Sequence, residues 1–243
     1  MTCIRGIHAA WSRLPVGGLT AIIGTGTCIV LAPHPDDESL GCGGLIAECV
    51  ASGRPPTILF LTDGTGSHPR SVEYHSDRLR TLRQHEAIAA VDALGASADC
   101  VLFLDQKDSA APIAGPEFDA VIAMILRVAP ASATAILAPW RHDPHCDHEA
   151  AALMAERVAR LRNLRLISYP VWGWTLPPAT EIDAPSRAGW RLDIARHLPA
   201  KRRAIGAHRS QLGRIITDDP TGFQLPPELL AVFDQPYETF LLS

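Results

Sequence analysis

The chain has 243 residues, 47% of them hydrophobic and 20% charged, and its net charge at pH 7 is -4. The composition is typical of a soluble globular protein, and the length suits one α/β domain or at most two small ones. The acidic balance excludes a strongly basic nucleic-acid binder. No apolar run reaches the roughly 20 residues that span a bilayer. The six cysteines form no CxxC pair, so we expect reduced thiols and a cytoplasmic protein.

The first 30 residues do not have the pattern of an export signal. Arg5 supplies a positive start, but Trp11, Arg13 and Pro15 interrupt the apolar stretch that follows it. We therefore expect an N-terminal extension that leads into the first strand.

From residue 27 to about residue 170, short apolar runs alternate with segments of helical spacing. The runs predict strands at 27–32, 57–62, 100–104, 135–139 and 164–169. The segments between them predict helices at 43–52, 71–94, 117–128 and 147–161. This alternation implies βαβ units with right-handed crossovers and a parallel sheet. Because such sheets bind ligands at the carboxyl ends of their strands, we expect the chemistry directly after the first, second and fourth strands.

Beyond residue 170 the alternation stops, and prolines break the chain into loops. The remaining pattern predicts a strand at 190–194, helices at 200–212 and 228–233, and a last strand at 238–242. No linker composition sets this part off. We therefore expect residues 1–243 to form one domain, with an α/β core at 27–170 and a C-terminal cap at 171–243.

Two polar loops follow the first and fourth predicted strands, PHPDDE at 33–38 and PWRHDPHCDH at 139–148. Zinc binds histidine and carboxylate ligands, and a catalytic zinc keeps three protein ligands and one open position. His34 and either Asp36 or Asp37 could supply two ligands, and a histidine of the second loop the third. The remaining carboxylate would then act as a general base. Fe²⁺ and Mn²⁺ are alternative metals for such ligands.

The alternative interpretation of these loops is that their aspartates only cap helices. This interpretation suits Asp147 at the start of a predicted helix. It does not explain two separate clusters of histidine and aspartate at neighbouring strand ends, so we favour the metal site.

These motifs resemble the LmbE-like, or PIG-L, family of N-acetylglucosaminyl deacetylases. The resemblance depends on PHPDDE at 33–38, TDG at 62–64, Arg83-x-x-Glu86 and HxDH at 145–148, with a less specific match at 201–211. It implies an α/β fold, a Rossmann-like three-layer sandwich with a mostly parallel sheet and a C-terminal cap region. It also implies a zinc-dependent hydrolase that removes an acyl group, usually acetyl, from the amide nitrogen of an amino sugar or sugar conjugate.

Carried over by position, the resemblance implies that the metal ligands are His34, Asp37 and His148. It implies that Asp36 is the general base, that His145 stabilises the tetrahedral oxyanion and that Asp147 orients His145. A protonated His145 could hold the oxyanion, and Asp147 beside it would favour the imidazolium form.

We expect the substrate to contact Arg83, Asp63 and Trp140. The resemblance implies this role for Arg83, for which a solvated charge or a salt bridge is the alternative. Asp63 could instead hold its loop or bond a histidine. Trp140 could form an aromatic wall for a sugar ring together with Trp172 and Trp174, or these rings could pack in the core.

We therefore predict a zinc-dependent N-deacetylase that acts on a small N-acylated sugar or glycoconjugate, without a nucleic-acid partner or a membrane span. Whether it forms a homo-oligomer is left open. One alternative is a metal-holding module that binds a glycan or a partner without catalysis. A metal phosphoesterase is less favoured, because the sequence offers ligands for one metal and two-metal enzymes need a larger set.

Overall fold

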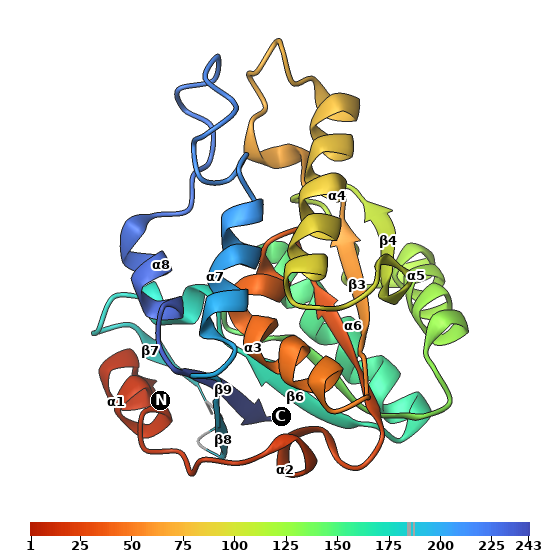
Figure 1. Cartoon of the computed structure of the whole chain (residues 1–243), viewed down its shortest axis with the longest axis vertical. Helices are drawn as coiled ribbons and strands as arrows, with labels where there is room; N and C mark the ends of the chain where they lie inside the picture. The colour runs from red at the N-terminus through yellow and green to blue at the C-terminus, as the bar shows by residue number, and fades with distance from the viewer. Residues whose placement is uncertain (184–185, 187) are drawn as a thin grey trace.

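The computed structural model describes residues 1–183, 186 and 188–243, and within them seven strands form one central sheet (Figure 1). The strands are β2 (Thr27–Ala32), β3 (Thr57–Thr62), β4 (Val101–Gln106), β5 (Ala133–Pro139), β6 (Arg165–Tyr169), β8 (Gly189–Asp193) and β9 (Tyr237–Leu242). They lie in the order β4-β3-β2-β5-β6-β9-β8. The first five are parallel, and β9 runs antiparallel to both of its neighbours.

Helices cover both faces of this sheet. One face carries α3 (Asp37–Ala51), α4 (Ser76–Ala93) and α7 (Leu198–Ala207), together with α2 (Leu19–Ile23) and α8 (Pro227–Phe233). The opposite face carries α5 (Gly115–Val128) and α6 (Cys146–Arg162). The predicted α/β fold with a mostly parallel sheet between helical layers is confirmed.

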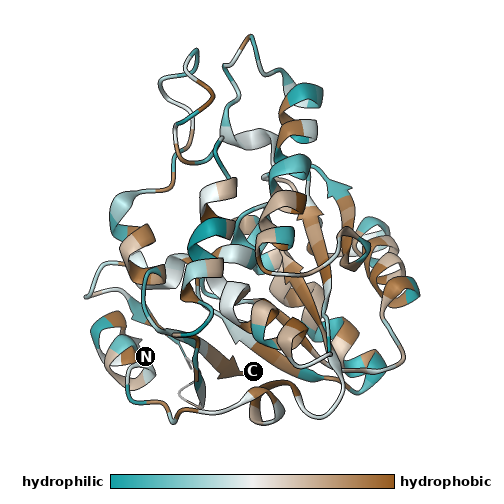
Figure 2. Cartoon of the chain, viewed as in Figure 1, coloured by the Kyte–Doolittle hydropathy of each residue, from teal (hydrophilic) through white to brown (hydrophobic). Residues whose placement is uncertain are grey.

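The central strands are apolar throughout because both of their faces are covered. In β2, Cys28, Val30 and Ala32 pack toward α3, whereas Ile29 and Leu31 pack toward α6. Figure 2 shows the resulting hydrophobic strands at the centre of the molecule. Full burial of a leucine or isoleucine side chain contributes about 1.5–3 kcal/mol, so these runs dominate the folding of the core.

The N-terminal segment leads into β2, and it contains helices of its own. The helix α1 (Ile4–Trp11) buries Trp11 in a cluster with Trp140. A second sheet pairs β1 (Thr2–Cys3) with β7 (Glu181–Ile182). The apolar residues of this short segment have helical spacing, and their burial against the main domain stabilises the helix.

Two helices of the core begin away from their predicted starts. The helix α3 begins at Asp37, before the predicted residue 43, because two acidic residues in its first turn suit a helix N-terminus. The helix α4 begins at Ser76, after the predicted residue 71, because residues 71–73 bond to the side chain of Asp218 instead.

The C-terminal residues extend the sheet as well as covering it. The strands β8 and β9 continue the sheet beside β6, and α7 packs on α3 and α4. The helix α7 ends at Ala207 rather than 212, because the following turn bonds His208 to Glu38 and Ser210 to Glu86. The assignment of residues 1–243 to one domain stays a prediction. None of the described helices is long and apolar enough to cross a membrane.

Candidate active site

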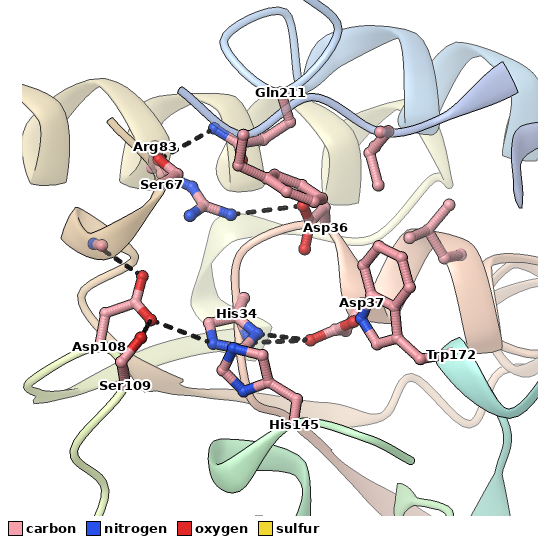
Figure 3. Close-up of a pocket in the computed structure, with 14 residues that line it drawn as sticks. His34, Asp36, Asp37, Ser67, Arg83, Asp108, Ser109, His145, Trp172 and Gln211 are labelled. Atoms are coloured by element: carbon pink, nitrogen blue, oxygen red, sulfur yellow. Dashed lines mark hydrogen bonds and ion pairs between the residues drawn. The ribbon is translucent and has the colours of Figure 1, made fainter. Parts of the chain in front are cut away.

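The candidate site lies where β2 and β5 run side by side at the centre of the sheet. The helix that follows β2 packs on one face of the sheet, and the helix that follows β5 packs on the other. The loops that lead from these strands into their helices therefore diverge, which makes this place a topological switch point. A cavity opens there (Figure 3). Its lining includes His34, Asp36, Asp37, Arg83, Asp108, His145, Trp172, Gln211 and Phe223.

The three predicted metal ligands converge at one end of this cavity. Nδ1 of His34 lies 3.2 Å from Oδ2 of Asp37, and Nε2 of His148 lies 3.3 Å from the same oxygen. Ligands of a tetrahedral zinc with bonds of about 2.0–2.1 Å are about 3.3–3.5 Å apart. Nε2 of His148 is buried and has no hydrogen-bond partner among the described residues. This orphaned nitrogen beside a carboxylate fits a metal ion.

Carboxylates hold the other ring nitrogens of both histidines. Nδ1 of His148 bonds to Oδ2 of Asp143 at 3.0 Å, and Nε2 of His34 bonds to Oδ2 of Asp147 at 3.1 Å. Such partners fix the orientation of metal-binding imidazoles. Burial opposes charge on His148, but the Asp37 and Asp143 carboxylates raise its pKa to about 9.

Asp36 lies beside this cluster and is almost fully buried. Its backbone has a φ of 150°, which is unfavourable for a residue with a side chain, and its N–H donates to Oε2 of Glu38 at 2.9 Å. Burial raises the pKa of Asp36 to about 6, although the Arg83 guanidinium acts in the opposite direction. A carboxylate with a pKa near neutrality can accept a proton and return it.

Arg83 lines the cavity, but its hydrogen bonds go to the protein. It donates to the carbonyl oxygens of Gly64 at 2.8 Å and Pro35 at 2.7 Å, and to Oδ2 of Asp36 at 3.3 Å. The alternative partner Glu86 instead accepts two bonds from the turn after α7. Arg83 therefore joins the loop after β3 to the loop that carries Asp36.

Asp63 holds its own loop, and it is absent from the lining of the cavity. Its Oδ1 accepts hydrogen bonds from the backbone and hydroxyl of Thr65 and from the backbone N–H of Asp108. This placement matches the structural alternative rather than the expected substrate contact.

Trp140 also lies away from the cavity, which corrects the expectation that it contacts the substrate. Its ring is 2% exposed and packs edge-on against Trp11 at 5.0 Å between centroids. Trp174 packs on the ring of Trp11, with the centroids 4.9 Å apart. Of the three tryptophans considered for an aromatic wall, Trp172 lines the cavity. The reason is that the N-terminal helix α1 places Trp11 against Trp140, a buried contact that we did not predict from the sequence.

His145 faces the cavity, and its environment differs from the expected one. Its Nδ1 accepts a hydrogen bond from the backbone N–H of Asp147 at 3.2 Å, which leaves the ring proton on Nε2. The Asp147 carboxylate lies 3.9 Å from this ring and is closer to His34. Burial, followed by the charges of His34 and His148, lowers the pKa of His145. The expectation of a stabilised imidazolium is therefore wrong, and a neutral Nε2–H donor faces the cavity.

Several residues of the site were missed in the sequence. Asp108 and Ser109 come from the loop after β4, and Gln211 and Phe223 come from the C-terminal segment. Asp108 follows the end of a parallel strand, and that position is the one signal that could have identified it. Gln211 ends the less specific family match at 201–211. Ser109 and Phe223 belong to no motif and reach the cavity through the tertiary fold.

The C-terminal segment reaches the cavity because it pairs with the loop before α4. The backbone N–H of Phe223 donates to the carbonyl of Ser67 at 2.7 Å. The Asp218 carboxylate accepts hydrogen bonds from the hydroxyl of Ser71 and the backbone N–H groups of Val72 and Glu73. Figure 1 shows these two loops side by side above the sheet.

Comparison with known proteins gives a consistent result. The family model described as PIG-L, GlcNAc-PI de-N-acetylase, matches residues 29–159. A 1D-myo-inositol 2-acetamido-2-deoxy-alpha-D-glucopyranoside deacetylase of Nocardia farcinica is 26% identical, over 82% of this chain and 83% of the relative. A diacetylchitobiose deacetylase of Thermococcus kodakarensis is 26% identical, over 75% of this chain and 69% of the relative.

Solved structures show the same fold. An N,N'-diacetylchitobiose deacetylase from Pyrococcus horikoshii superposes with a TM-score of 0.64 and 17% identity. The match covers 89% of this chain and 83% of that one. At this level of identity, the likeness concerns the arrangement of the sheet and its helices.

Proposed function

The chain belongs to the PIG-L family of GlcNAc-PI de-N-acetylases and is an N-deacetylase, and we propose that it hydrolyses the N-acetyl amide of an amino sugar or sugar conjugate. The products would be acetate and a free amine. The observation that carries this proposal is the orphaned Nε2 of His148, which lies 3.3 Å from Asp37, and Asp37 lines the cavity together with Asp36.

His34, Asp37 and His148 would hold the metal, for which we propose zinc, with Fe²⁺ as the alternative. When bound, the metal would polarise the amide carbonyl and lower the pKa of a water molecule toward 7. Asp143 and Asp147 keep the two imidazoles in position through their other ring nitrogens.

Asp36 would accept the proton of the attacking water and then donate it to the leaving amine. The attack forms a carbon–oxygen bond at the carbonyl, and the carbon–nitrogen bond breaks as the amine is protonated. Arg83 positions Asp36 and the backbone of Pro35. His145 would donate its Nε2–H to the oxyanion. Loss of one such donor raises the activation barrier by about 2.7–4 kcal/mol.

An aromatic wall supports a sugar as the substrate. The rings of Trp172 and Phe223 meet at 72° with centroids 5.8 Å apart, and both line the cavity. Aromatic faces suit the apolar face of a pyranose ring, while the carboxylates and histidines bind its polar groups. Trp172 thus takes the role that we expected of Trp140.

The test measures acetate release from N,N'-diacetylchitobiose and related N-acetyl sugars. Treatment with a chelator should abolish the release, and zinc or anaerobic Fe²⁺ should restore it. Asp36→Asn should lower kcat about 10²–10⁴-fold with the metal content unchanged. Asp92→Asn, an exposed carboxylate on α4, is the matched control.

Unchanged activity in the Asp36→Asn enzyme would overturn the mechanism. Absence of any turnover by the metal-loaded enzyme on N-acyl sugars would favour the alternative of a binding module without catalysis.

A further inference from the structure

The side chain of Gln211 lines the cavity, and neither the proposed metal site nor the proposed chemistry uses it. It lies in the turn that follows α7 and is fully buried. Its backbone is held on both sides, because its N–H donates to the carbonyl of His208 at 3.0 Å and its carbonyl accepts from the N–H of Leu225 at 2.7 Å. Leu225 lines the same cavity. The turn therefore fixes this amide at the cavity wall.

A chain of hydrogen bonds determines which way the amide of Gln211 is turned. The hydroxyl of Ser210 donates its single proton to Oε2 of Glu86 at 2.6 Å, so its oxygen can only accept from Gln211. The amide atom that lies 2.9 Å from this oxygen is accordingly Nε2, which also lies 3.4 Å from Oγ of Ser67. The amide nitrogen thus faces the two serines, and Oε1 is turned away from them.

Oε1 of Gln211 is buried and has no hydrogen-bond partner among the described residues. Buried polar atoms nearly always have a partner in the protein, in water or in a ligand. The nearest cation of the lining does not supply one, since Arg83 donates to the carbonyls of Gly64 and Pro35 and to Asp36. A molecule bound in the cavity can supply the missing donor.

The chemical kind of this donor follows from the position of Gln211 relative to Asp36. In Figure 3, Gln211 and Arg83 lie on one side of Asp36, whereas His34 and His145 lie on the other. In the proposed reaction the acetamide binds on the side of the histidines, where the metal would polarise its carbonyl. The part of the substrate that reaches Gln211 is therefore the sugar, and the hydrogen-bond donors of a sugar are its hydroxyl groups.

We propose that Oε1 of Gln211 accepts a hydrogen bond from a hydroxyl of the amino sugar and thereby selects the substrate. This inference rests on the proposed function of the site. Gln211 takes no part in making or breaking bonds, and it acts as a specificity residue. A site that binds a hydroxyl rejects an analogue that lacks it, because the acceptor of the site is then left buried and unpaired.

The test compares N-acetylglucosamine with analogues that each lack one hydroxyl, by kcat/KM for acetate release from the zinc-loaded enzyme. With the wild-type enzyme, one analogue should lose about tenfold or more in kcat/KM. Gln211→Met has a similar volume but no amide, so it should treat that analogue and the parent sugar alike. Gln235→Met, at an exposed glutamine after α8, is the matched control and should keep the wild-type ratio. A purely structural role of Gln211 would lower both rates equally, and an unchanged ratio would overturn the proposal.

A binding measurement separates this proposal from the proposed function. Calorimetry with glucosamine, the expected product, and with its deoxy analogues needs no turnover, and the ratio of their Kd values should also collapse in Gln211→Met. Absence of acetate release with a Kd ratio that depends on Gln211 would refute the proposed function and support the specificity role. If Gln211→Met does not fold, Gln211→Asn replaces it, because the shorter side chain keeps the amide and withdraws its oxygen from the sugar. Ratios that stay at the wild-type value in the folded variant would refute the specificity role.

Discussion

At the scale of single residues, buried carboxylates of the site accept hydrogen bonds from neighbouring groups and fix the orientation of those groups. Asp143 shows this most clearly, because its Oδ2 accepts from Nδ1 of His148 and from the backbone N–H groups of Val171 and Trp172. One side chain therefore positions a proposed metal ligand and the aromatic wall together. The metal end and the substrate end of the cavity are coupled through it.

Asp143→Asn should weaken metal binding about 10–100-fold, because the amide no longer provides a charged acceptor for the histidine. Metal affinity is measured by competition with a chromogenic chelator, with Asp92→Asn as the control. Unaltered affinity in the folded variant would show that Asp143 has no part in orienting His148.

The buried pair of His208 and Glu38 makes stability depend on pH. Burial alone would lower the pKa of His208, but the Glu38 carboxylate at 3.0 Å raises it. The stabilisation is therefore fully present below the unfolded pKa of about 6.5 and is lost as the pH rises through the higher folded pKa.

His208→Asn should cost about 1.5–3 kcal/mol of unfolding free energy at pH 6, and less at pH 8.5. Urea denaturation of both proteins at the two pH values measures this difference. A cost that is equal at both pH values would show that the proton on His208 does not stabilise the fold.

At the scale of elements, the side chain of Asp218 joins two loops at the rim of the cavity, beside the neighbouring Asp219, which accepts from the backbone N–H of Arg70. The segments before α4 and after α7 are far apart in sequence, and the Asp218 carboxylate bonds one to the other. Because Phe223 belongs to the second of these loops, the position of the aromatic wall depends on this contact.

Asp218→Ala should raise KM several-fold with little change in kcat, because the rim loosens while the catalytic side chains stay in place. Hydrogen exchange at the amides of Val72 and Glu73 should become faster, since both lose their acceptor. Asp119→Ala on the far helix layer is the control. If KM stays normal while hydrogen exchange becomes fast, the rim has no part in substrate binding.

At the scale of the whole molecule, a buried ion pair ties the last strand to the helical layer. Glu238 on β9 bonds Lys201 on α7 at 2.6 Å and accepts from the backbone N–H groups of Gly44 and Leu45 in α3. Both charged side chains are almost fully buried. The C-terminal residues are therefore connected to the first βα unit, and we expect the chain to unfold as one unit.

Glu238→Ala should destabilise the protein by about 3–5 kcal/mol, because it leaves the Lys201 ammonium buried without a partner. The double variant Glu238→Gln with Lys201→Met should recover part of this loss. Urea unfolding followed by two spectroscopic probes measures the change. Two separate transitions in the wild-type chain would contradict the single domain.

The sequence by itself determined the sheet core, the family resemblance and the two polar loops. The five strands of the core follow from apolar runs, and the position of PHPDDE and HxDH follows from the rule that ligands bind at the carboxyl ends of parallel strands. These signals lie in local stretches of sequence, so they can be recognised without knowing which segments pack against them. The roles assigned to His34, Asp37 and His148 remain a proposal, although the fold brings them together.

Only the tertiary structure decided what surrounds these loops. Trp140 lies in the core and does not line the cavity, because α1 packs on its ring. Asp147 lies closer to His34 than to His145. Asp108 and Phe223 line the cavity, although their segments are distant in sequence from the two polar loops. The physical reason is that such contacts join residues far apart in sequence, and no local periodicity or spacing encodes the partner of a buried side chain.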